Sequence, residues 1–364
     1  MLFIQIKKII SYTPGIILAL VLYLLSEGIN NVIGIELMGY EKSPISTVMI
    51  AIIIGMIMGN AFIPRPGFKI GLKFTQDYIL KFGIICLGIR LSFNEFIKFG
   101  TIAIPLIITC IISVLVVIKL LIKRFKISSK MSYLIAIGTS VCGATAIVAT
   151  APVINAKKGE VAYAIANITL FGVFTMLVYP YFANLYFEGN SLYAGLFLGT
   201  AIHETSQVAA AGMIYDQQFN SPETLNIATV TKLIRNTFLV IMIPLFGYLY
   251  NRGNTEGKRV SVFTIFPYFV LGFIAMIFFR NIGDQVVQIQ NYNIEKWDMI
   301  ISYTKDSAKI CLTMAMAAVG MSTNFGELRE MGHKPFVIGL IAAITVGFVS
   351  IITMQTFERI TSLL

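Results

Sequence analysis

Four ionisable residues in the middle of two long apolar stretches stand out in this sequence. His203 and Glu204 are adjacent in one stretch, and Lys232 and Arg235 are three residues apart in the next. An ionisable group inside a membrane-spanning segment is costly to insert and is a functional candidate by default. A histidine takes up and releases a proton near neutral pH. We therefore predict that His203 and Glu204, with Gln207, couple activity to a proton or a cation.

The two cations predict a site for an anion. Lys232 and Arg235 share one face of a helix. If Glu204 pairs with one of them, the other has no acid partner in the membrane, and a bound anion would balance its charge. We expect Arg235→Gln to abolish stabilisation by the anion without unfolding the protein. Structural alternatives are a neutral His203 bonded to a neighbouring helix, and cations that extend to the membrane surface.

The segment from Gly138 to Pro152 places small polar residues and two glycines where a spanning helix would carry Leu and Ile. This pattern predicts a broken helix, which is tolerated in a membrane only inside protein or beside a wet cavity. The N-termini of its halves would direct N–H groups at an anion. The alternative is close helix packing through small residues. The predicted substrate-binding residues in this segment are Thr139, Ser140, Cys142, Gly143 and Thr145.

A second segment, Gly199 to Gly212, opens with the same Gly-Thr pair 61 residues later and contains His203. The pair His203-Glu204 lacks the second histidine of a zinc-binding His-Glu-x-x-His motif, because position 207 is Gln. The sequence therefore predicts no metal site here. No nucleophile or cofactor motif accompanies these residues, and we predict no catalytic residues and no cofactor.

The composition sets the class of protein that must position these residues. Of 364 residues, 57% are hydrophobic and 13% are charged, and the mean hydropathy is +0.81, whereas soluble domains carry about 25% charged residues. A soluble protein is excluded, and continuous apolar runs exclude a β-barrel. The sequence predicts an all-α polytopic membrane protein with broken, crossing helices. Eleven spans are expected, at 13–33, 45–63, 79–93, 101–122, 131–151, 160–184, 192–214, 226–250, 260–280, 304–322 and 334–356.

The basic residues predict the orientation in the membrane. With the N-terminus inside, sixteen Lys and Arg lie in inside segments and ten in outside segments, which favours a cytoplasmic N-terminus. The net charge of +10 is assigned to these loops and not to nucleic acid. Loops are short, so residues 1–364 are expected to form one transmembrane domain.

An internal repeat supports a transporter. Residues 87–100 align without gaps on residues 319–332, and both copies carry Gly, Phe, Glu and Gly at matching positions. The aligned ends belong to the third and tenth spans, which run in opposite directions, and inverted repeats are typical of secondary transporters. The predicted repeat halves are about 45–184 and 192–356. Chance similarity between two Gly-rich helix ends is the alternative.

Four ordered motifs carry a resemblance to a known family. They begin at Gly138, Gly199, Val230 and Met314, and together they resemble the YeiH family of bacterial inner-membrane proteins over nearly the whole chain. Members of this family are labelled sulfate exporters. The family is similar in layout to the bile-acid symporter and cation/proton antiporter superfamily, in which broken helices cross at the substrate site. This chain departs from that layout, because by the expected span count the His203 segment follows two spans after the first and runs parallel to it. The alternatives are a different span count, a re-entrant segment at Gly138 or Gly199, or a different order of the repeats.

We predict a secondary active transporter that exports a small anion, which the resemblance suggests contains sulfur, with H⁺ or Na⁺ as the coupling ion. A cation/proton antiporter is the alternative in the same class. An intramembrane enzyme that uses His203 and Glu204 and a passive channel are alternatives from other classes. The expected partners are the anion, the coupling ion and the lipid bilayer, with a homodimer as a possible assembly. The resemblance implies the bacterial cytoplasmic membrane.

Overall fold

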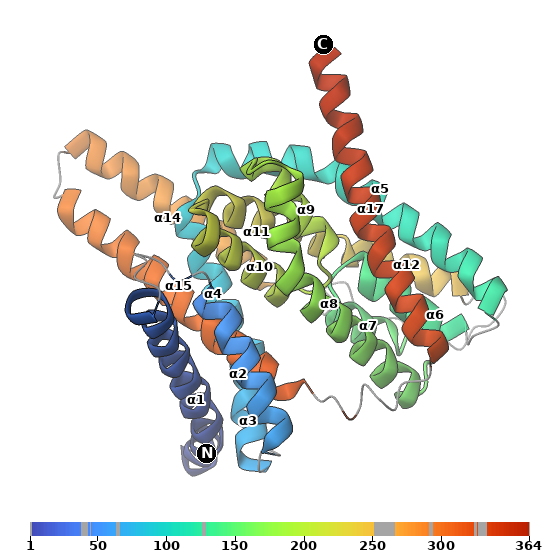
Figure 1. The fold of residues 1–364 in the computed structure, drawn as a ribbon, viewed down its shortest axis with the longest axis horizontal. Helices are drawn as coiled ribbons and strands as arrows, with labels where there is room; N and C mark the ends of the chain where they lie inside the picture. Colours follow the sequence, from blue (N-terminus) through green and yellow to red (C-terminus); the bar gives the residue numbers. More distant parts are fainter. Residues whose placement is uncertain are drawn as a thin grey trace. The chain divides into compact units, whose positions relative to one another are not determined.

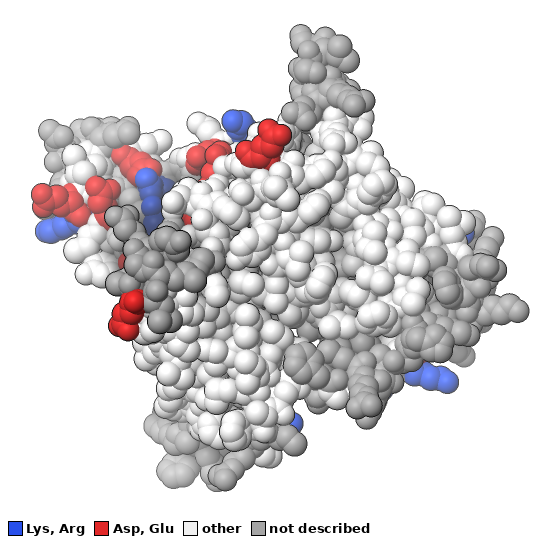
Figure 2. Space-filling model, viewed as in Figure 1, with Lys and Arg blue, Asp and Glu red and all other residues white. Residues whose placement is uncertain are grey.

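The computed structural model describes residues 2–37, 43, 45–62, 66–125, 129–250, 266–290, 294–323, 326 and 333–363. Within these ranges the regular elements are helices and no strand occurs. Six of the helices are long and apolar enough to cross a membrane by length and composition. Figure 2 shows that most of the visible face, apart from the grey residues, carries no charged side chain. The described part of the chain therefore confirms the all-α membrane class.

The chain forms two compact units that interleave along the sequence. Unit 1 contains residues 1–96, 213–222 and 268–325, and unit 2 contains residues 97–212, 223–267 and 326–364. These boundaries differ from the predicted repeat halves.

Unit 1 contains helices that pack closely through glycine. On α2, a Cβ atom added to Gly55 would lie 2.4 Å from the carbonyl oxygen of Ala317, and on α15 one added to Gly320 would lie 2.4 Å from that of Ile52. The two helices therefore touch along their backbones, as helices do in small-residue membrane interfaces. Figure 1 shows α2 beside α15 and α1 beside α3. The elements of unit 1 are α1 (Leu2–Asn31), the π-helix η1 (Val32–Leu37), α2 (Thr47–Ala61), α3 (Pro66–Phe74), the π-helix η2 (Thr75–Ile79), α4 (Leu80–Leu87), the 3₁₀ turn η3 (Gly88–Arg90), α14 (Phe269–Gln290) and α15 (Ile294–Ser322).

Unit 2 surrounds the predicted site with long helices. Two of these helices expose large apolar side chains: Ile112, Leu120 and Phe348 are 56%, 62% and 63% exposed. Lipid would cover this surface. Its helices are α5 (Phe93–Phe125), α6 (Ser129–Ser140), α7 (Ala144–Thr150), α8 (Lys158–Tyr186), α9 (Ser191–Ala201), α10 (Thr205–Phe219), α11 (Pro222–Thr237), α12 (Leu239–Tyr250) and α17 (His333–Leu363). The first turn of α5, the last turns of α10 and the first residue of α11 belong to unit 1.

The helices overlap the predicted spans, but two of those spans each contain a three-residue break, and the span at 226–250 is interrupted at Phe238. The span expected at 131–151 is divided between α6 and α7, and the one at 192–214 between α9 and α10. The predicted alignment of residues 87–100 with 319–332 stays a prediction, because residues 324, 325 and 327–332 lie outside the described ranges.

Candidate functional site

The first broken helix folds back on itself. Lys130 near the start of α6 donates from Nζ to the carbonyl oxygen of Asn155, beyond the end of α7, at 2.7 Å. A continuous helix would separate these residues by about 38 Å. A Cβ atom on Gly138 would lie 2.9 Å from Ile147 Cδ1, so the two arms pack together near the turn. We call residues 129–155 hairpin 1, and its tip is residues 141–143.

Glycine makes this tip possible. Gly143 has φ +69° and ψ −131°, a conformation that essentially only glycine adopts. Its N–H donates to the carbonyl oxygen of Gly138 at 2.9 Å. The interpretation of 131–151 as a span that crosses the membrane is therefore corrected. The sequence pattern marks the break, but a pattern of small residues does not specify the direction of the chain after it.

The second broken helix also folds back, as its two arms show against α11. The first arm, α9, runs parallel to α11, because Cβ atoms on Gly195 and Gly199 would contact Ile227 and Thr231 respectively.

The second arm, α10, runs antiparallel to α11. Thr205 Oγ1 at its start accepts a hydrogen bond from Asn236 Nδ2 at 2.9 Å, whereas a Cβ atom on Gly212 would contact Leu225. The arms α9 and α10 are therefore antiparallel to each other. We call residues 191–219 hairpin 2, and its tip is residues 202–204.

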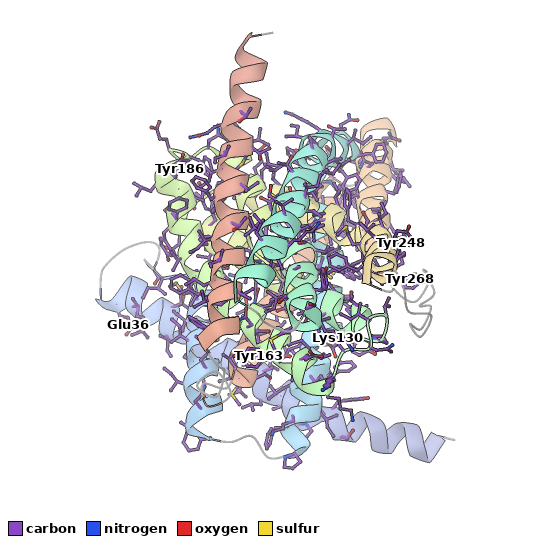
Figure 3. All side chains as sticks on the ribbon, turned by 90° about the vertical axis from the view of Figure 1, so that its right-hand side faces the viewer. Glu36, Lys130, Tyr163, Tyr186, Tyr248 and Tyr268 are labelled. Carbon is purple, nitrogen blue, oxygen red and sulfur yellow. The ribbon has the colours of Figure 1, made fainter. Side chains whose placement is uncertain are left out.

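The hairpins approach each other from opposite ends of α8. Figure 3 shows Lys130 and Tyr163 toward one end of unit 2 and Tyr186 at the other. Hairpin 2 begins where Tyr193 packs on Phe187 beyond the C-terminus of α8. Its tip lies near the middle of α8, where Gln207 Nε2 donates to the carbonyl oxygen of Thr169 at 3.5 Å. The expectation of two parallel crossing segments is corrected, because each segment turns back.

The two tips touch. A Cβ atom on Gly143 would lie 2.6 Å from Glu204 Cγ and 3.5 Å from its Cα. The Glu204 carboxylate accepts a hydrogen bond from the N–H of Ala144, the first residue of α7. The side chain of one hairpin therefore caps the second arm of the other, which satisfies an N–H that the helix itself cannot bond.

The side chain of Lys232 binds backbone carbonyls at the tips of both hairpins. Its ammonium donates to the carbonyl oxygens of Val141 at 3.0 Å, Ile202 at 2.9 Å and His203 at 2.5 Å. The side chain is fully buried. An ammonium group has three hydrogens, so these three carbonyls use all of them. In this structure Lys232 has no donor left for a bound anion.

Arg235 binds the next carbonyls along the same two segments. Its Nε donates to the carbonyl oxygen of Ser140 at 2.7 Å, and Nη1 and Nη2 donate to those of Thr200 and Thr139. It too is fully buried. A guanidinium has five hydrogens, so Arg235 retains capacity that Lys232 lacks.

The pattern of these bonds follows the 61-residue offset between the hairpins. Arg235 binds Thr139 and Thr200, and Lys232 binds Val141 and Ile202, and each pair differs by 61. The last carbonyls of a helix lack partners within the helix and carry a partial negative charge. Lys232 and Arg235 supply donors and positive charge to the ends of α6 and α9 at once. Their role as ligands of an anion stays a prediction.

The other side of the tips is more accessible. Thr145 is exposed, and Ala144, Glu204 and Thr205 are half-buried. Gln207 Oε1 accepts from the N–H of Glu204 at 3.3 Å, which caps α10 at its first turn. Of the predicted site residues, Thr145 and Glu204 are therefore not fully buried within the protein.

The buried side of the tips contains polar atoms without partners. Ser140 Oγ, His203 Nδ1 and Asn236 Oδ1 are buried and have no hydrogen-bond partner among the described residues. Buried polar atoms of this kind are rare and mark sites for water, an ion or a moving group. Cys142 and Thr139 are buried beside them. Among the described residues, no three His, Cys, Asp or Glu side chains come together as a metal site would need.

Sequence reasoning missed two residues of this site. Asn236 binds Thr205, and its only signal is its position beside Arg235. On α8, a Cβ atom on Gly172 would lie 2.0 Å from Gln207 Oε1, so this position must be glycine for Gln207 to pack against α8. In the sequence, the only sign of this role is a single glycine within an apolar span.

Because each hairpin turns back, the two loops that flank it are expected to lie on the same side of the membrane. Single cysteines at Lys130 and Lys158 are expected to react with a membrane-impermeant maleimide from one side, and cysteines at Glu188 and Glu223 from the other. Labelling of intact and permeabilised cells measures this. If hairpin 1 crossed the membrane instead, Lys130 and Lys158 would react from opposite sides.

Together these features define a class of protein: an all-helical membrane protein with two broken helices that fold back as hairpins and touch at their tips. The chain belongs to the family described as "Conserved hypothetical protein 698", which matches residues 14–339. This is the YeiH/UPF0324 family, so the resemblance drawn from the four motifs is confirmed.

Relatives over nearly the full length are bacterial membrane proteins. The UPF0324 membrane protein SAG1125 of Streptococcus agalactiae is 35% identical over 343 residues, with 94% of this chain and 96% of the relative covered. The UPF0324 membrane protein FN0533 of Fusobacterium nucleatum is 33% identical, with 85% and 89% covered. A UPF0324 membrane protein of Clostridium tetani is 31% identical, with 98% and 99% covered. No solved structure matches the chain.

Proposed function

We propose that this protein is a secondary active transporter of a small anion, coupled to H⁺ or Na⁺. The observation that carries the proposal is the meeting of two re-entrant hairpins near the middle of α8, with Glu204 at one tip and with Lys232 and Arg235 of α11 bonded to both hairpins. Non-helical backbone at membrane depth is tolerated only inside protein or beside a water-filled cavity, and in secondary transporters it forms the substrate and ion site. Contacts between separate hairpins can open and close without unfolding either one, which alternating access requires.

The charges at the tips favour an anion. Each hairpin contributes one helix C-terminus and one N-terminus, so their partial charges nearly cancel. Lys232 and Arg235 then outweigh Glu204 by one positive charge. A cation/proton antiporter would need an excess of acid, and Glu204 is the acid that the described residues place at the tips.

The same charges couple the anion to a proton. Protonation of Glu204 removes one negative charge from the site and strengthens anion binding, and by linkage the anion strengthens proton binding. Anion and proton would then move together, and the direction would follow the two gradients. A sulfur-containing substrate, export and Na⁺ coupling stay predictions.

The hairpin topology also strengthens the proposed orientation. Lys157 and Lys158 move to the same side as the start of α6, which raises the inside count of Lys and Arg from sixteen to eighteen and lowers the outside count from ten to eight. Nine of the predicted spans would still cross the membrane. This distribution favours a cytoplasmic N-terminus under the positive-inside rule, and the bacterial cytoplasmic membrane stays the proposed location.

Uptake into proteoliposomes tests the proposal. Radiolabelled sulfate, sulfite, thiosulfate, a sulfonate and a carboxylate would be compared with and without pH and Na⁺ gradients. We expect saturable, gradient-dependent uptake of at least one anion. An ion flux far above the turnover rate of a transporter would indicate a channel, and a covalent change in a substrate would indicate an enzyme. Either result contradicts the proposal.

The pH profile of uptake tests the coupling residues. Uptake measured from about pH 5 to 8 is expected to change with pH in the wild type, because His203 and Glu204 can exchange protons. Glu204→Gln is expected to flatten the profile, since Gln keeps the shape of the side chain but cannot lose a proton. His203→Gln is the companion variant. An identical profile in all three proteins would remove both residues from the coupling.

A further inference from the structure

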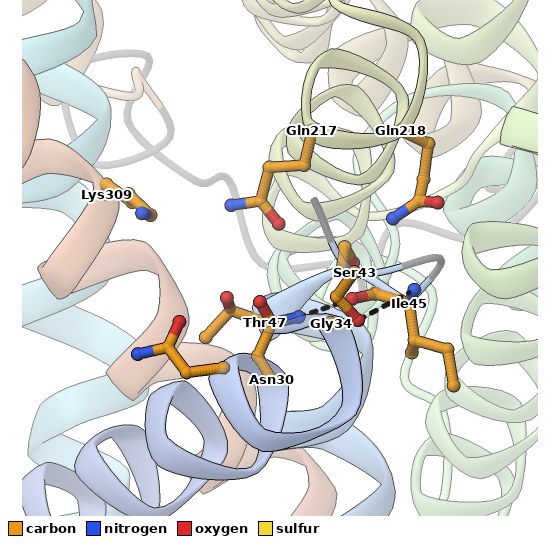
Figure 4. A pocket seen from close by; sticks show the side chains of 10 residues that line it. Asn30, Gly34, Ser43, Ile45, Thr47, Gln217, Gln218 and Lys309 are labelled. Atoms are coloured by element: carbon orange, nitrogen blue, oxygen red, sulfur yellow. Dashed lines mark hydrogen bonds between the residues drawn. The ribbon is translucent and has the colours of Figure 1, made fainter. Parts of the chain in front are cut away.

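Helix α10 carries three glutamines, and two of them lie in unit 1. Gln217 and Gln218 line a polar pocket there (Figure 4). Part of the wall of this pocket comes from the segment 38–44, most of which lies outside the described ranges, so the pocket supports no assignment of a ligand. The third glutamine, Gln207, lies in the first turn of α10 in unit 2, and its side chain contacts residues that the structure describes.

The amide of Gln207 joins hairpin 2 to α8. The side chain is fully buried. Its Oε1 accepts from the N–H of Glu204 at 3.3 Å, and its Nε2 donates to the carbonyl oxygen of Thr169 at 3.5 Å. Because an N–H can only donate and a carbonyl can only accept, these two partners fix which way round the amide lies. Neither a leucine nor a carboxylate at position 207 could make both bonds.

The backbone of α8 also restricts the position of this amide. A Cβ atom on Gly172 would lie 2.0 Å from Oε1, 2.6 Å from Cδ and 2.7 Å from Nε2 of Gln207. The three atoms nearest to that position therefore all belong to the amide. Gly172 lies one helical turn from Thr169 and on the same face of α8. This face supplies both a hydrogen-bond partner for the amide and the space that it occupies.

The bond to Glu204 fixes one peptide group from two directions. The peptide group between His203 and Glu204 carries the carbonyl of His203 and the N–H of Glu204. Lys232 Nζ donates to that carbonyl at 2.5 Å, and Gln207 Oε1 accepts from that N–H at 3.3 Å. A peptide group is planar, so bonds to its carbonyl and to its N–H together fix its orientation. The side chains of His203 and Glu204 therefore start from fixed positions.

The position of Glu204 matters because its side chain contacts the other hairpin. Its carboxylate accepts from the N–H of Ala144, and a Cβ atom on Gly143 would lie 3.5 Å from Glu204 Cα. A glutamate side chain is short, so a rotation of the preceding peptide group would carry the carboxylate away from Ala144. The bond that Gln207 makes to the backbone of Glu204 opposes this rotation.

We propose that Gln207 is a positioning residue. Held by α8, its amide fixes the peptide group between His203 and Glu204 and so directs the Glu204 carboxylate at hairpin 1. In this role Gln207 takes part in coupling without binding the proton itself. The part that Glu204 plays in coupling rests on the proposed transport function, but the position in which Gln207 holds Glu204 can be measured without transport.

Labelling of Glu204 by a hydrophobic carbodiimide tests this role in the purified full-length protein in detergent. The reagent adds to protonated carboxyl groups, and mass spectrometry measures its rate of addition at Glu204. In the wild type the contact with Ala144 restrains this carboxyl group. Gln207→Leu is close in size but makes neither bond, and it is expected to raise the rate about fivefold or more, since the loss of one hydrogen bond of typical strength changes an equilibrium by about that factor.

Ser350→Ala is the matched control. Ser350 on α17 and Thr200 on α9 share a buried hydrogen bond of 2.6 Å, so this variant weakens the other arm of hairpin 2 and removes no bond to the peptide group between residues 203 and 204. Glu204 in Ser350→Ala should be labelled at the wild-type rate. Glu188, which is exposed, is the internal reference and should be labelled equally in every protein.

A second set of variants tests the same contact if Gln207→Leu does not fold. Gly172→Ala places a methyl group on the amide of Gln207 and is expected to lower the midpoint of thermal unfolding by about 3 °C or more. In a Gln207→Ala background the same change should lower the midpoint much less, because the amide that the methyl group would meet is gone.

The proposal is overturned if folded Gln207→Leu is labelled at the wild-type rate. It is also overturned if Ser350→Ala raises the rate as much as Gln207→Leu does, which would show a general loosening of hairpin 2. An equal effect of Gly172→Ala in both backgrounds would contradict the contact with α8. A wild-type protein without uptake would contradict the proposed function and leave these three measurements unaffected.

Discussion

Replacing Lys232 with Met is expected to destabilise the protein by about 3 kcal/mol or more. The side chain is fully buried and donates to three carbonyls at the hairpin tips. Without it those acceptors lose their donor in a place that water does not reach, and each such loss costs roughly 1–3 kcal/mol. Thermal unfolding of the purified protein in detergent measures the loss. Arg235→Gln is expected to destabilise by a similar amount, since it removes most of the hydrogen bonds to three other carbonyls.

A matched control separates this effect from a general loss of charge. Lys98→Met removes an exposed lysine from α5 and is expected to change stability by less than about 0.5 kcal/mol. The sequence-based expectation was that Arg235→Gln keeps the protein folded and loses only its anion. Wild-type stability in both Lys232→Met and Arg235→Gln would show that the cations are not structural and would return them to the substrate site.

Gly143→Ala is expected to have the second large effect, a loss of uptake together with a destabilisation of about 2 kcal/mol or more. The residue has φ +69°, where an alanine is strained by about 1–3 kcal/mol. The new methyl group would also lie 2.6 Å from Glu204 Cγ, so the tips could not meet as they do. Thermal unfolding and proteoliposome uptake measure the two effects.

The control for this variant is Gly159→Ala. That glycine lies in the first turn of α8, and a Cβ atom there would meet nothing within 4 Å, so the change should be neutral or slightly stabilising. A double variant with Glu204→Ala tests the contact directly. If the tips touch, the combined destabilisation will be smaller than the sum of the single effects. Simple additivity would contradict the contact.

The sequence by itself determined the class of protein and the places where its helices break. Apolar runs of about 20 residues specify membrane helices whatever their partners, because the bilayer is the solvent that selects them. The Gly-Thr segments at 138 and 199 mark breaks because small polar residues cannot build an ordinary lipid-facing helix. The same local signals single out His203, Glu204, Lys232 and Arg235, since charge in an apolar run is costly anywhere.

Only the tertiary structure decided the direction of the chain after each break. A helix that continues and one that turns back have the same composition, and the choice depends on contacts such as Lys130 with Asn155, 25 residues apart. The partners of the two buried cations also depend on the direction of the chain after each break. Lys232 and Arg235 bind backbone carbonyls, which every residue has, so no residue type in the sequence identifies them. The physical reason is that only the last carbonyls of a helix lack partners within it. The position of those carbonyls in space depends on how the two hairpins pack.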